Sequence, residues 1–141
     1  MRNILIIGAG RSATSLIKYL LDKSVTENLF LTIGDINIEN AQKLTSGHPN
    51  GRGILLDVFN HQQRKQAVKD SDVVISMLPA RFHIEVARDY ISYGKHLVTA
   101  SYISDDMQQL DQVAKEKGLV FMNEIGLDPG IDHMSAMQVI D

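Results

Sequence analysis

Residues 4–13 read ILIIGAGRSA, and this stretch decides the fold. A run of branched apolar residues, typical of a buried β-strand, ends at a glycine, and a helix-forming segment follows. The pattern Gly-x-Gly-x-x-Ala between them is typical of the first turn of a dinucleotide-binding domain. Gly8 permits a tight turn, Gly10 lets the backbone approach a pyrophosphate, and Ala13 lets the helix pack closely on the strand. The amides at the helix start would hold the anion, and a purely structural glycine turn is the alternative.

The alternation of strand and helix continues along the whole chain. Short apolar runs, most of them β-branched, lie at residues 4–7, 29–33, 53–56, 73–77, 96–99 and 119–122. Polar segments with helical periodicity separate them, at residues 12–22, 38–44, 62–69, 83–93 and 105–117. Such alternation predicts an α/β fold, a doubly wound parallel sheet of the Rossmann type with strand order 3-2-1-4-5-6. Ligands of this fold bind at the carboxyl ends of the strands.

The composition fits a single domain spanning residues 1–141. The chain is 44% hydrophobic and 22% charged, with a net charge of −3, so nucleic acid and anionic membrane are poor partners. No apolar run is long enough to span a bilayer, and no signal peptide precedes the first strand. The absence of Cys excludes disulfides and thiolate metal sites. We therefore expect a cytoplasmic domain.

Asp35 stands at the end of the second apolar run. A carboxylate there can accept hydrogen bonds from the adenosine ribose hydroxyls and would repel the 2′-phosphate of NADP. No Arg or Lys follows before Lys43. The sequence therefore favours NAD, with NADP as the second choice; alternatively, Asp35 only caps the following turn.

Other turns follow predicted strands at the same rim. Asp57 and Val58 close the third apolar run. Leu78 and Pro79 follow the fourth, and Pro79 would fix the chain direction there. In this topology both turns line the crevice that holds a dinucleotide. An ordinary connection is an equally good interpretation of either turn.

Ser101 and Tyr102 follow the fifth apolar run and offer a hydroxyl group each. They could bind substrate or cap the next helix, and we favour binding. The histidines show no partner at ligand spacing, and the segment His83-Ile-Glu85 is not a zinc-protease motif. We therefore predict no metal site, and the sequence does not identify a catalytic acid or base.

Residues 123–137, NEIGLDPGIDHMSAM, follow the sixth apolar run and lie at the same rim. Asp128 precedes Pro129 and is held extended, after which Gly130 allows the chain to turn into a helix that begins at Ile131. This would direct the Asp128 carboxylate towards the nicotinamide side of a bound dinucleotide, where it can accept hydrogen bonds from an amine. The loop therefore has the character of a substrate edge.

Three motifs together resemble one known family. Residues 75–104 contain an LP-x-x-x-H pattern and the segment TASY, and residues 123–141 contain GLDPGIDHM followed by AM-x-x-ID. This combination closely resembles the saccharopine dehydrogenase (glutamate-forming) family, also called saccharopine reductases. The resemblance covers the whole chain and is weakest in detail at residues 42–57.

The resemblance implies an oxidoreductase of lysine metabolism that interconverts saccharopine with 2-aminoadipate semialdehyde and glutamate by hydride transfer to or from NAD(P). It implies substrate contacts for Ser101, Tyr102 and Asp128. The residues expected around the cofactor are Gly8, Gly10, Arg11, Ser12, Asp35, Asp57, Val58, Leu78 and Pro79. Fungal members that use NADP have a basic residue near the end of the second strand, whereas animal members that use NAD have Asp there, as this chain does.

Family members are larger than this chain and add a substrate and dimerisation domain. We therefore expect residues 1–141 to be the nucleotide-binding part of a homodimeric enzyme that acts on a small amino-acid substrate, and to be inactive alone. Two alternatives remain open at this point. One is imine reduction in a polyamine pathway, as in the related carboxynorspermidine dehydrogenases. The other is a regulatory Rossmann module that senses a nucleotide.

Overall fold

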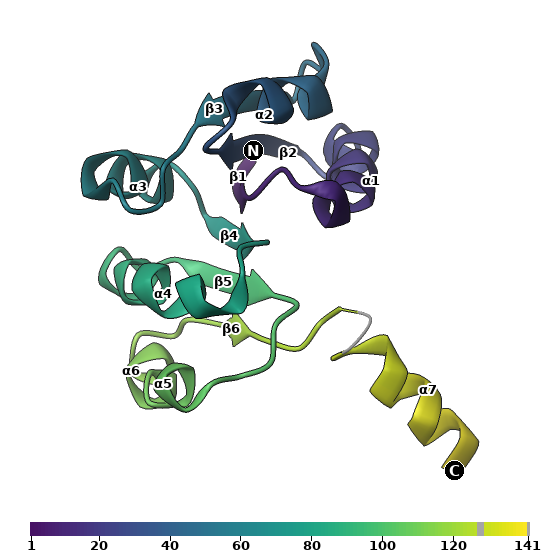
Figure 1. The fold of residues 1–141 in the computed structure, drawn as a ribbon, viewed down its shortest axis with the longest axis vertical. Coiled ribbons are helices and arrows are strands. Elements are labelled where there is room, and N and C mark those ends of the chain that lie inside the picture. Colours follow the sequence, from purple (N-terminus) through teal and green to yellow (C-terminus); the bar gives the residue numbers. More distant parts are fainter. Residues whose placement is uncertain (127–128, 141) are drawn as a thin grey trace.

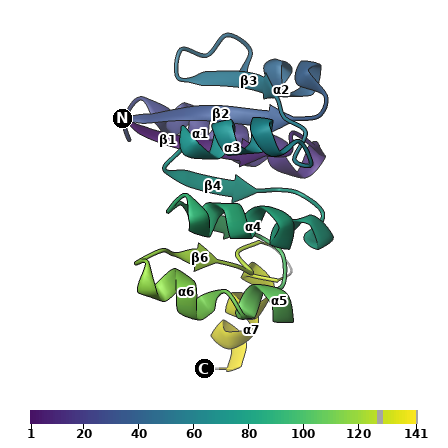
Figure 2. The same cartoon turned by 90° about the vertical axis from the view of Figure 1, so that its left-hand side faces the viewer.

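The strands form one six-stranded sheet in the order β3-β2-β1-β4-β5-β6 (Figure 1). The computed structural model describes residues 1–126 and 129–140. Its strands are β1 (Arg2–Ile7), β2 (Leu29–Asp35), β3 (Gly51–Leu55), β4 (Val73–Ser76), β5 (His96–Thr99) and β6 (Phe121–Met122). All neighbouring strands pair in parallel, so their carboxyl ends meet at one edge of the sheet, on the right in Figure 2. The predicted doubly wound order is confirmed.

Helices cover both faces of the sheet (Figures 1 and 2). On one face lie α3 (His61–Lys69), α4 (His83–Ser92), α5 (Asp105–Gln108) and α6 (Asp111–Glu116). The opposite face carries α1 (Thr14–Ser24) and α2 (Ile38–Thr45). This division follows from right-handed crossovers, which place the connections of the two halves of the sheet on opposite sides.

The core consists of two apolar clusters, one on each face of the sheet. Successive side chains of a strand point to opposite faces, and β1 supplies both clusters. Leu5 and Ile7 pack in the cluster under α3 and α4, whereas Ile6 packs in the cluster under α1 and α2. All three are at most 1% exposed, which explains why the strand is apolar throughout rather than alternating.

The helix predicted over residues 105–117 is two helices, and the prediction is wrong in this respect. Its start is as expected, because the hydroxyl of Ser104 accepts a hydrogen bond of 3.1 Å from the amide of Met107. The amide of Leu110 then bonds to the carbonyl of Met107, only three residues back, and this tight turn separates α5 from α6. Met107 and Ala114 are both buried, so the apolar spacing of one helix continues across the break. The sequence pattern therefore gives no sign of the break.

Several strand boundaries also differ from the sequence prediction by one or two residues, and β3 and β6 illustrate the reasons. β3 begins at Gly51, which pairs with Leu31 of β2, because glycines can join a ladder without adding to an apolar pattern. β6 has only two residues, Phe121 and Met122, and both pair with β5. Neither change alters the order of the sheet.

The last helix, α7 (Ile131–Ile140), projects away from the sheet (Figure 1). It begins at the predicted residue. Its apolar side chains are exposed on all sides, with Met134 66% and Val139 86% exposed. Within residues 1–126 and 129–140, no helix combines the length and apolar character needed to cross a membrane.

Candidate dinucleotide site at the carboxyl edge of the sheet

The glycine-rich loop leaves β1 in a conformation that requires its first glycine. Gly8 has a φ of +103°, and a side-chain carbon added there would lie 3.1 Å from the carbonyl oxygen of Met77, the residue that follows β4. The Gly8 amide donates to the carbonyl of Gly34 at 2.8 Å, which fixes the loop over the end of β2. The chain then enters a short 3-10 turn over Arg11–Ala13.

Gly10 presents the open side of this loop. No atom lies within 4 Å of the position that a side-chain carbon would occupy there. Arg11 and Ser12 are exposed at the start of the 3-10 turn. The free backbone surface therefore lies where a pyrophosphate is expected.

Asp35 ends β2 and is held by two backbone amides. Its Oδ2 accepts from Ala9 in the glycine-rich loop and its Oδ1 accepts from Asn37, both at 2.7 Å. A carboxylate has about four acceptor positions, so each oxygen retains capacity for one further donor. The two amides fix the orientation of the carboxylate and leave acceptor positions for a ligand.

Five of the predicted cofactor residues line one hollow of about 180 Å³ at this edge. Gly8 and Asp35 belong to this lining, and Asp57, Val58 and Leu78 join it from the loops that follow β3 and β4. The rest of the lining was not predicted and consists of Ile7, Gly34, Ile36, Leu56, Phe59 and Phe82. An apolar slot beside a carboxylate is suited to a flat base attached to a ribose.

Phe59 and Phe82 form the outer wall of this hollow. Their rings meet edge to face, with centroids 5.0 Å apart and an angle of 86° between the planes. Phe59 remains 60% exposed although its ring contacts that of Phe82. Aromatic residues directly after Val58 and shortly after Pro79 were the available sequence signal for this wall.

Asp57 and Pro79 have clear local roles at the rim. The Oδ1 of Asp57 accepts from the Phe59 amide at 2.9 Å, so this carboxylate shapes its own turn. The carbonyl of Pro79 accepts from the amide of Phe82 at 2.9 Å and starts the 3-10 turn Ala80–Phe82. The role of either residue as a cofactor contact stays a prediction.

A second hollow lies on the other side of the glycine-rich loop. It is lined by Gly10 and Arg11 from the loop and by Lys43 from α2, among other residues. Lys43 is thus spatially close to the loop although it is distant in sequence. Two cationic side chains in one hollow can bind an anion such as a phosphate.

Ser101 belongs to a hydrogen-bonded cluster centred on His83, the first residue of α4. The Nε2 of His83 lies 2.8 Å from the Ser101 hydroxyl, and its Nδ1 lies 2.9 Å from the hydroxyl of Ser76. His83 is only 4% exposed, and burial lowers the pKa of its imidazole below the usual value. This histidine was not predicted as a site residue because it has no partner at metal-ligand spacing, although the LP-x-x-x-H pattern already placed it at the rim.

The loops after β5 and β6 are tied together next to this cluster. The Glu124 amide donates to the carbonyl of Ser101 at 3.0 Å, and the carboxylate of Glu124 accepts from the amide of Ile103 at 3.1 Å. Tyr102 is 60% exposed between them. The predicted substrate residue Asp128 lies outside the described residues.

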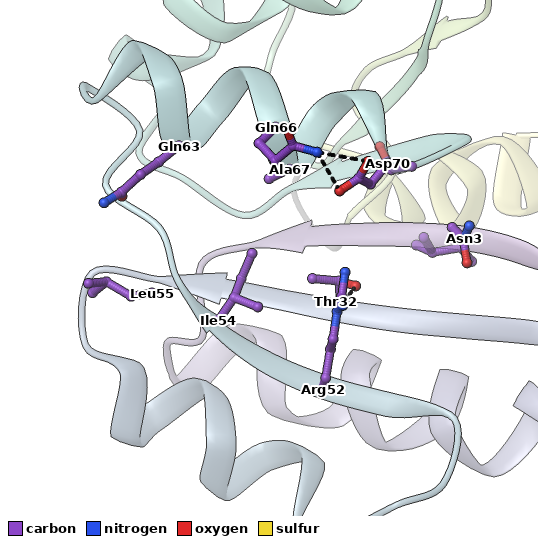
Figure 3. Close-up of a pocket in the computed structure, with 11 residues that line it drawn as sticks. Asn3, Thr32, Arg52, Ile54, Leu55, Gln63, Gln66, Ala67 and Asp70 are labelled. Atoms are coloured by element: carbon purple, nitrogen blue, oxygen red, sulfur yellow. Dashed lines mark hydrogen bonds between the residues drawn. The ribbon is translucent and has the colours of Figure 1, made fainter.

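A third hollow lies away from this edge, between α3 and strands β1, β2 and β3 (Figure 3). Four of its polar side chains form two hydrogen-bonded pairs. Gln66 donates to both oxygens of Asp70 at 3.1 and 3.0 Å, and the Nε of Arg52 donates to the hydroxyl of Thr32 at 3.2 Å (Figure 3). This arrangement is suited to a solvated surface groove rather than to a cofactor.

The side chains in the described part of the chain do not group into a metal site. No three His, Asp or Glu residues among them come together in an arrangement that could hold an ion.

Known proteins resemble this chain in both sequence and structure. Residues 4–122 match the family described as the saccharopine dehydrogenase NADP binding domain. A saccharopine dehydrogenase (NADP(+), L-glutamate-forming) from Pyricularia oryzae is 38% identical over 140 residues, which are 99% of this chain and 30% of that protein. The mitochondrial alpha-aminoadipic semialdehyde synthase of Mus musculus is 34% identical over 99% of this chain and 15% of its own length.

A solved structure matches the fold over the full length of the chain. The apo saccharopine dehydrogenase (L-Glu forming) from Saccharomyces cerevisiae has a TM-score of 0.88 and 35% sequence identity to it. The match covers 100% of this chain and 31% of that one. The chain therefore spans about a third of the length of its fungal relatives.

Proposed function

Because this chain belongs to the saccharopine dehydrogenase family, we propose that it is the nucleotide-binding part of an enzyme that interconverts saccharopine with 2-aminoadipate semialdehyde and glutamate. The observation that carries the proposal is the hollow at the carboxyl edge, which joins the glycine-rich loop, Asp35 and an apolar slot. These residues fit a nicotinamide dinucleotide. The names of the family and of its fungal relatives specify NADP.

The proposed reaction defines what the rim must do. In the direction of saccharopine cleavage, a carbon attached to the secondary amine loses a hydride and the amine becomes an imine. Water then adds to that carbon, and the C–N bond breaks to release glutamate and the semialdehyde. A nicotinamide dinucleotide held at this edge would supply the hydride acceptor. The rim of this domain therefore has to bind an amino acid against the nicotinamide, and Ser101, Tyr102 and Asp128 are the proposed contacts.

For the cofactor we propose a preference for NAD. Two amides hold the Asp35 carboxylate at the end of β2, where its remaining acceptor positions suit the two ribose hydroxyls. A 2′-phosphate would bring a second negative charge to this carboxylate. Ile36, the next residue, is 73% exposed and offers no compensating cation.

NADP is the second candidate, and one specific observation favours it. Arg11 and Lys43 line the hollow beside the glycine-rich loop. A 2′-phosphate turned away from Asp35 could bind to these cations. Lys43→Ala would then weaken NADPH binding and leave NADH binding unchanged.

The rest of the enzyme is proposed to supply the other wall of the active site. The exposed apolar side chains of α7, which include Ile131, Met134 and Met137, are suited to contact with such a part. Dimerisation of the complete enzyme and a cytoplasmic location stay predictions. The comparisons favour neither a polyamine imine reductase nor a nucleotide-sensing module.

A single substitution in the loop tests whether the dinucleotide binds at this edge. Gly10 has an extended backbone, with a φ of −74°, and open space around it, so Gly10→Val should fold normally. The added side chain would stand where the pyrophosphate binds, and NADH affinity should fall by at least about tenfold, or 1.4 kcal/mol. Ala67→Leu, in the groove of Figure 3, is the matched control and should bind NADH like the wild type. Unchanged NADH binding by Gly10→Val would refute the site.

A further inference from the structure

His83 connects the ends of two adjacent strands to the proposed substrate edge. Ser76 is the last residue of β4, Thr99 is the last residue of β5, and Ser101 follows two residues later. The hydroxyls of all three residues lie within 3.1 Å of a ring nitrogen of His83. The imidazole is therefore the common hydrogen-bonding partner of three chain segments.

The ring is suited to this role as a neutral group. Within the described residues, all of its hydrogen-bonding partners are hydroxyl groups and none is a carboxylate. A neutral imidazole has one donor and one acceptor nitrogen, and a hydroxyl can match either of them. Both ring nitrogens are thus occupied in either tautomer.

Ser101 is fixed by its backbone as well as by its side chain. Its amide donates to the hydroxyl of Thr99 at 3.3 Å, and its carbonyl accepts from the amide of Glu124 at 3.0 Å. The contact with His83 adds the third constraint, on the hydroxyl group itself. A hydroxyl has one donor and two acceptor positions, so Ser101 retains hydrogen-bonding capacity for a ligand at the rim. Ser101 is also half-buried, whereas Ser76 and Thr99 are each 1% exposed.

We propose that His83 is a positioning residue for the reaction, which holds the Ser101 hydroxyl in the orientation that receives a polar atom of the amino-acid substrate. This inference rests on the proposed function, because Ser101 is a substrate contact only within it. His83 acts through Ser101 and does not itself touch the substrate. Preorganisation of this kind lowers the free-energy barrier because the hydroxyl need not be ordered when the substrate binds.

A double-mutant cycle in the complete enzyme tests the connection. His83→Leu removes all three ring contacts. Loss of the one to Ser101 should lower kcat/KM for saccharopine by roughly tenfold, the effect of one hydrogen bond, while NADH affinity stays within about twofold. In a Ser101→Ala background the same replacement should change kcat/KM by less than about twofold, since its target is already absent. An equally large loss in that background would overturn the proposal, because His83 would then act independently of Ser101.

Conservative variants separate positioning from packing. His83→Gln retains an amide group that can contact the Ser101 hydroxyl, so its kcat/KM should be close to that of the wild type. This variant tests the contact even if His83→Leu folds poorly. His96→Leu is the matched control, because His96 is a partly buried histidine that accepts a hydrogen bond from the Val120 amide at the opposite end of β5. This control should leave kcat/KM for saccharopine unchanged. A Gln variant no better than Leu would contradict the role of the hydrogen bond.

Nuclear magnetic resonance of the imidazole nitrogens tests the contact without any substrate. In the 141-residue chain, Ser101→Ala should shift the signal of the His83 Nε2 far more than that of Nδ1. Unchanged signals would overturn the proposal whatever the substrate is. A shifted signal combined with a wild-type enzyme that does not turn over saccharopine would instead overturn the proposed function, so the two failures are distinguishable.

Discussion

The Oδ2 atom of Asp35 accepts a hydrogen bond of 2.7 Å from the backbone amide of Ala9, which joins the end of β2 to the glycine-rich loop. One carboxylate therefore shapes the loop proposed to bind the pyrophosphate and faces the position expected for the ribose. Its Oδ1 is fixed in the same way by the amide of Asn37. The cofactor preference of the domain should depend on this residue.

The wild-type domain should prefer NADH to NADPH by at least about tenfold, or 1.4 kcal/mol. The reason is like-charge repulsion between the 2′-phosphate and the Asp35 carboxylate, which is stronger where both groups are poorly solvated. Fluorescence titration with both nucleotides measures this ratio. Equal or tighter binding of NADPH would show that Asp35 does not act on the ribose.

Replacing Asp35 by Ser and Ile36 by Arg together should move the preference towards NADPH. The first change removes the repulsive charge, and the second places a cation on a side chain that is already 73% exposed. Ile36→Arg alone should have a smaller effect, because Asp35 would pair with the new guanidinium. Val25→Arg, on an exposed residue at the end of α1, controls for added charge and should leave the ratio unchanged.

Much of this architecture could be predicted from the sequence, because strands covered on both faces leave a strong local signal. Leu5, Ile6 and Ile7 are apolar since helices cover both sides of β1, and together with the alternation of strands and helices this predicts a parallel sheet. The break at Leu110 was not predictable in this way, because the apolar spacing continues from Met107 to Ala114. Local backbone hydrogen bonding, which side-chain patterns do not report, decides such a turn.

Only part of the candidate site could be predicted from the sequence. Gly8 and Asp35 carry chemistry that sequence position alone indicates. His83 was missed because its partners Ser76 and Ser101 are ordinary hydroxyl residues that only the sheet brings together. Phe59 and Phe82 were missed for a similar reason, since they meet across two separate loops.

Asp128 is predicted to bind the amine of the substrate. In the complete enzyme, Asp128→Ala should lower kcat/KM for saccharopine by roughly ten- to a hundredfold, which corresponds to about 1.5–3 kcal/mol for a charge-assisted hydrogen bond. NADH affinity should remain close to that of the wild type. Joint loss of NADH binding and thermal stability would mean that Asp128 shapes its loop instead.

The stability of the domain should fall as the solution is acidified through the titration range of histidine. Burial lowers the pKa of His83 from 6.5, so below about pH 6.5 the unfolded chain binds a proton that the folded chain does not. Above that pH the ring is neutral in both the folded and the unfolded chain, so it does not make the stability depend on pH. His83→Gln should therefore remove part of the slope, at most about 1.4 kcal/mol per pH unit.

Urea unfolding at about pH 7.5 and about pH 5.5 measures this difference, with the slope for each variant set by proton linkage. Gln62→Ala, at an exposed residue without a titratable side chain, is the control and should keep the wild-type slope. If His83→Gln also keeps the wild-type slope, the His83 ring is protonated as readily in the folded chain as in the unfolded one. The claim that this ring is neutral in its cluster of hydroxyls would then be wrong.

Tyr90 offers a test of the core. Its ring is fully buried, and its hydroxyl has no hydrogen-bond partner within residues 1–126 and 129–140. Burial raises the pKa of this phenol well above its ordinary value. Tyr90→Phe removes an unsatisfied polar group and should raise the free energy of unfolding by about 1 kcal/mol. Tyr93→Phe, on a half-buried ring, is the control. A loss of stability in Tyr90→Phe would contradict this prediction, because it would show that the Tyr90 hydroxyl has a hydrogen-bond partner.

Saccharopine-dependent formation of NADH tests the proposed function most directly. The complete enzyme should produce NADH and glutamate in equal amounts from saccharopine. The 141-residue chain should bind NADH and produce none, because orienting the reacting carbon can contribute roughly 7–11 kcal/mol to lowering the barrier. A complete enzyme that forms neither NADH nor NADPH from saccharopine, or a 141-residue chain that forms either of them alone, would contradict the account.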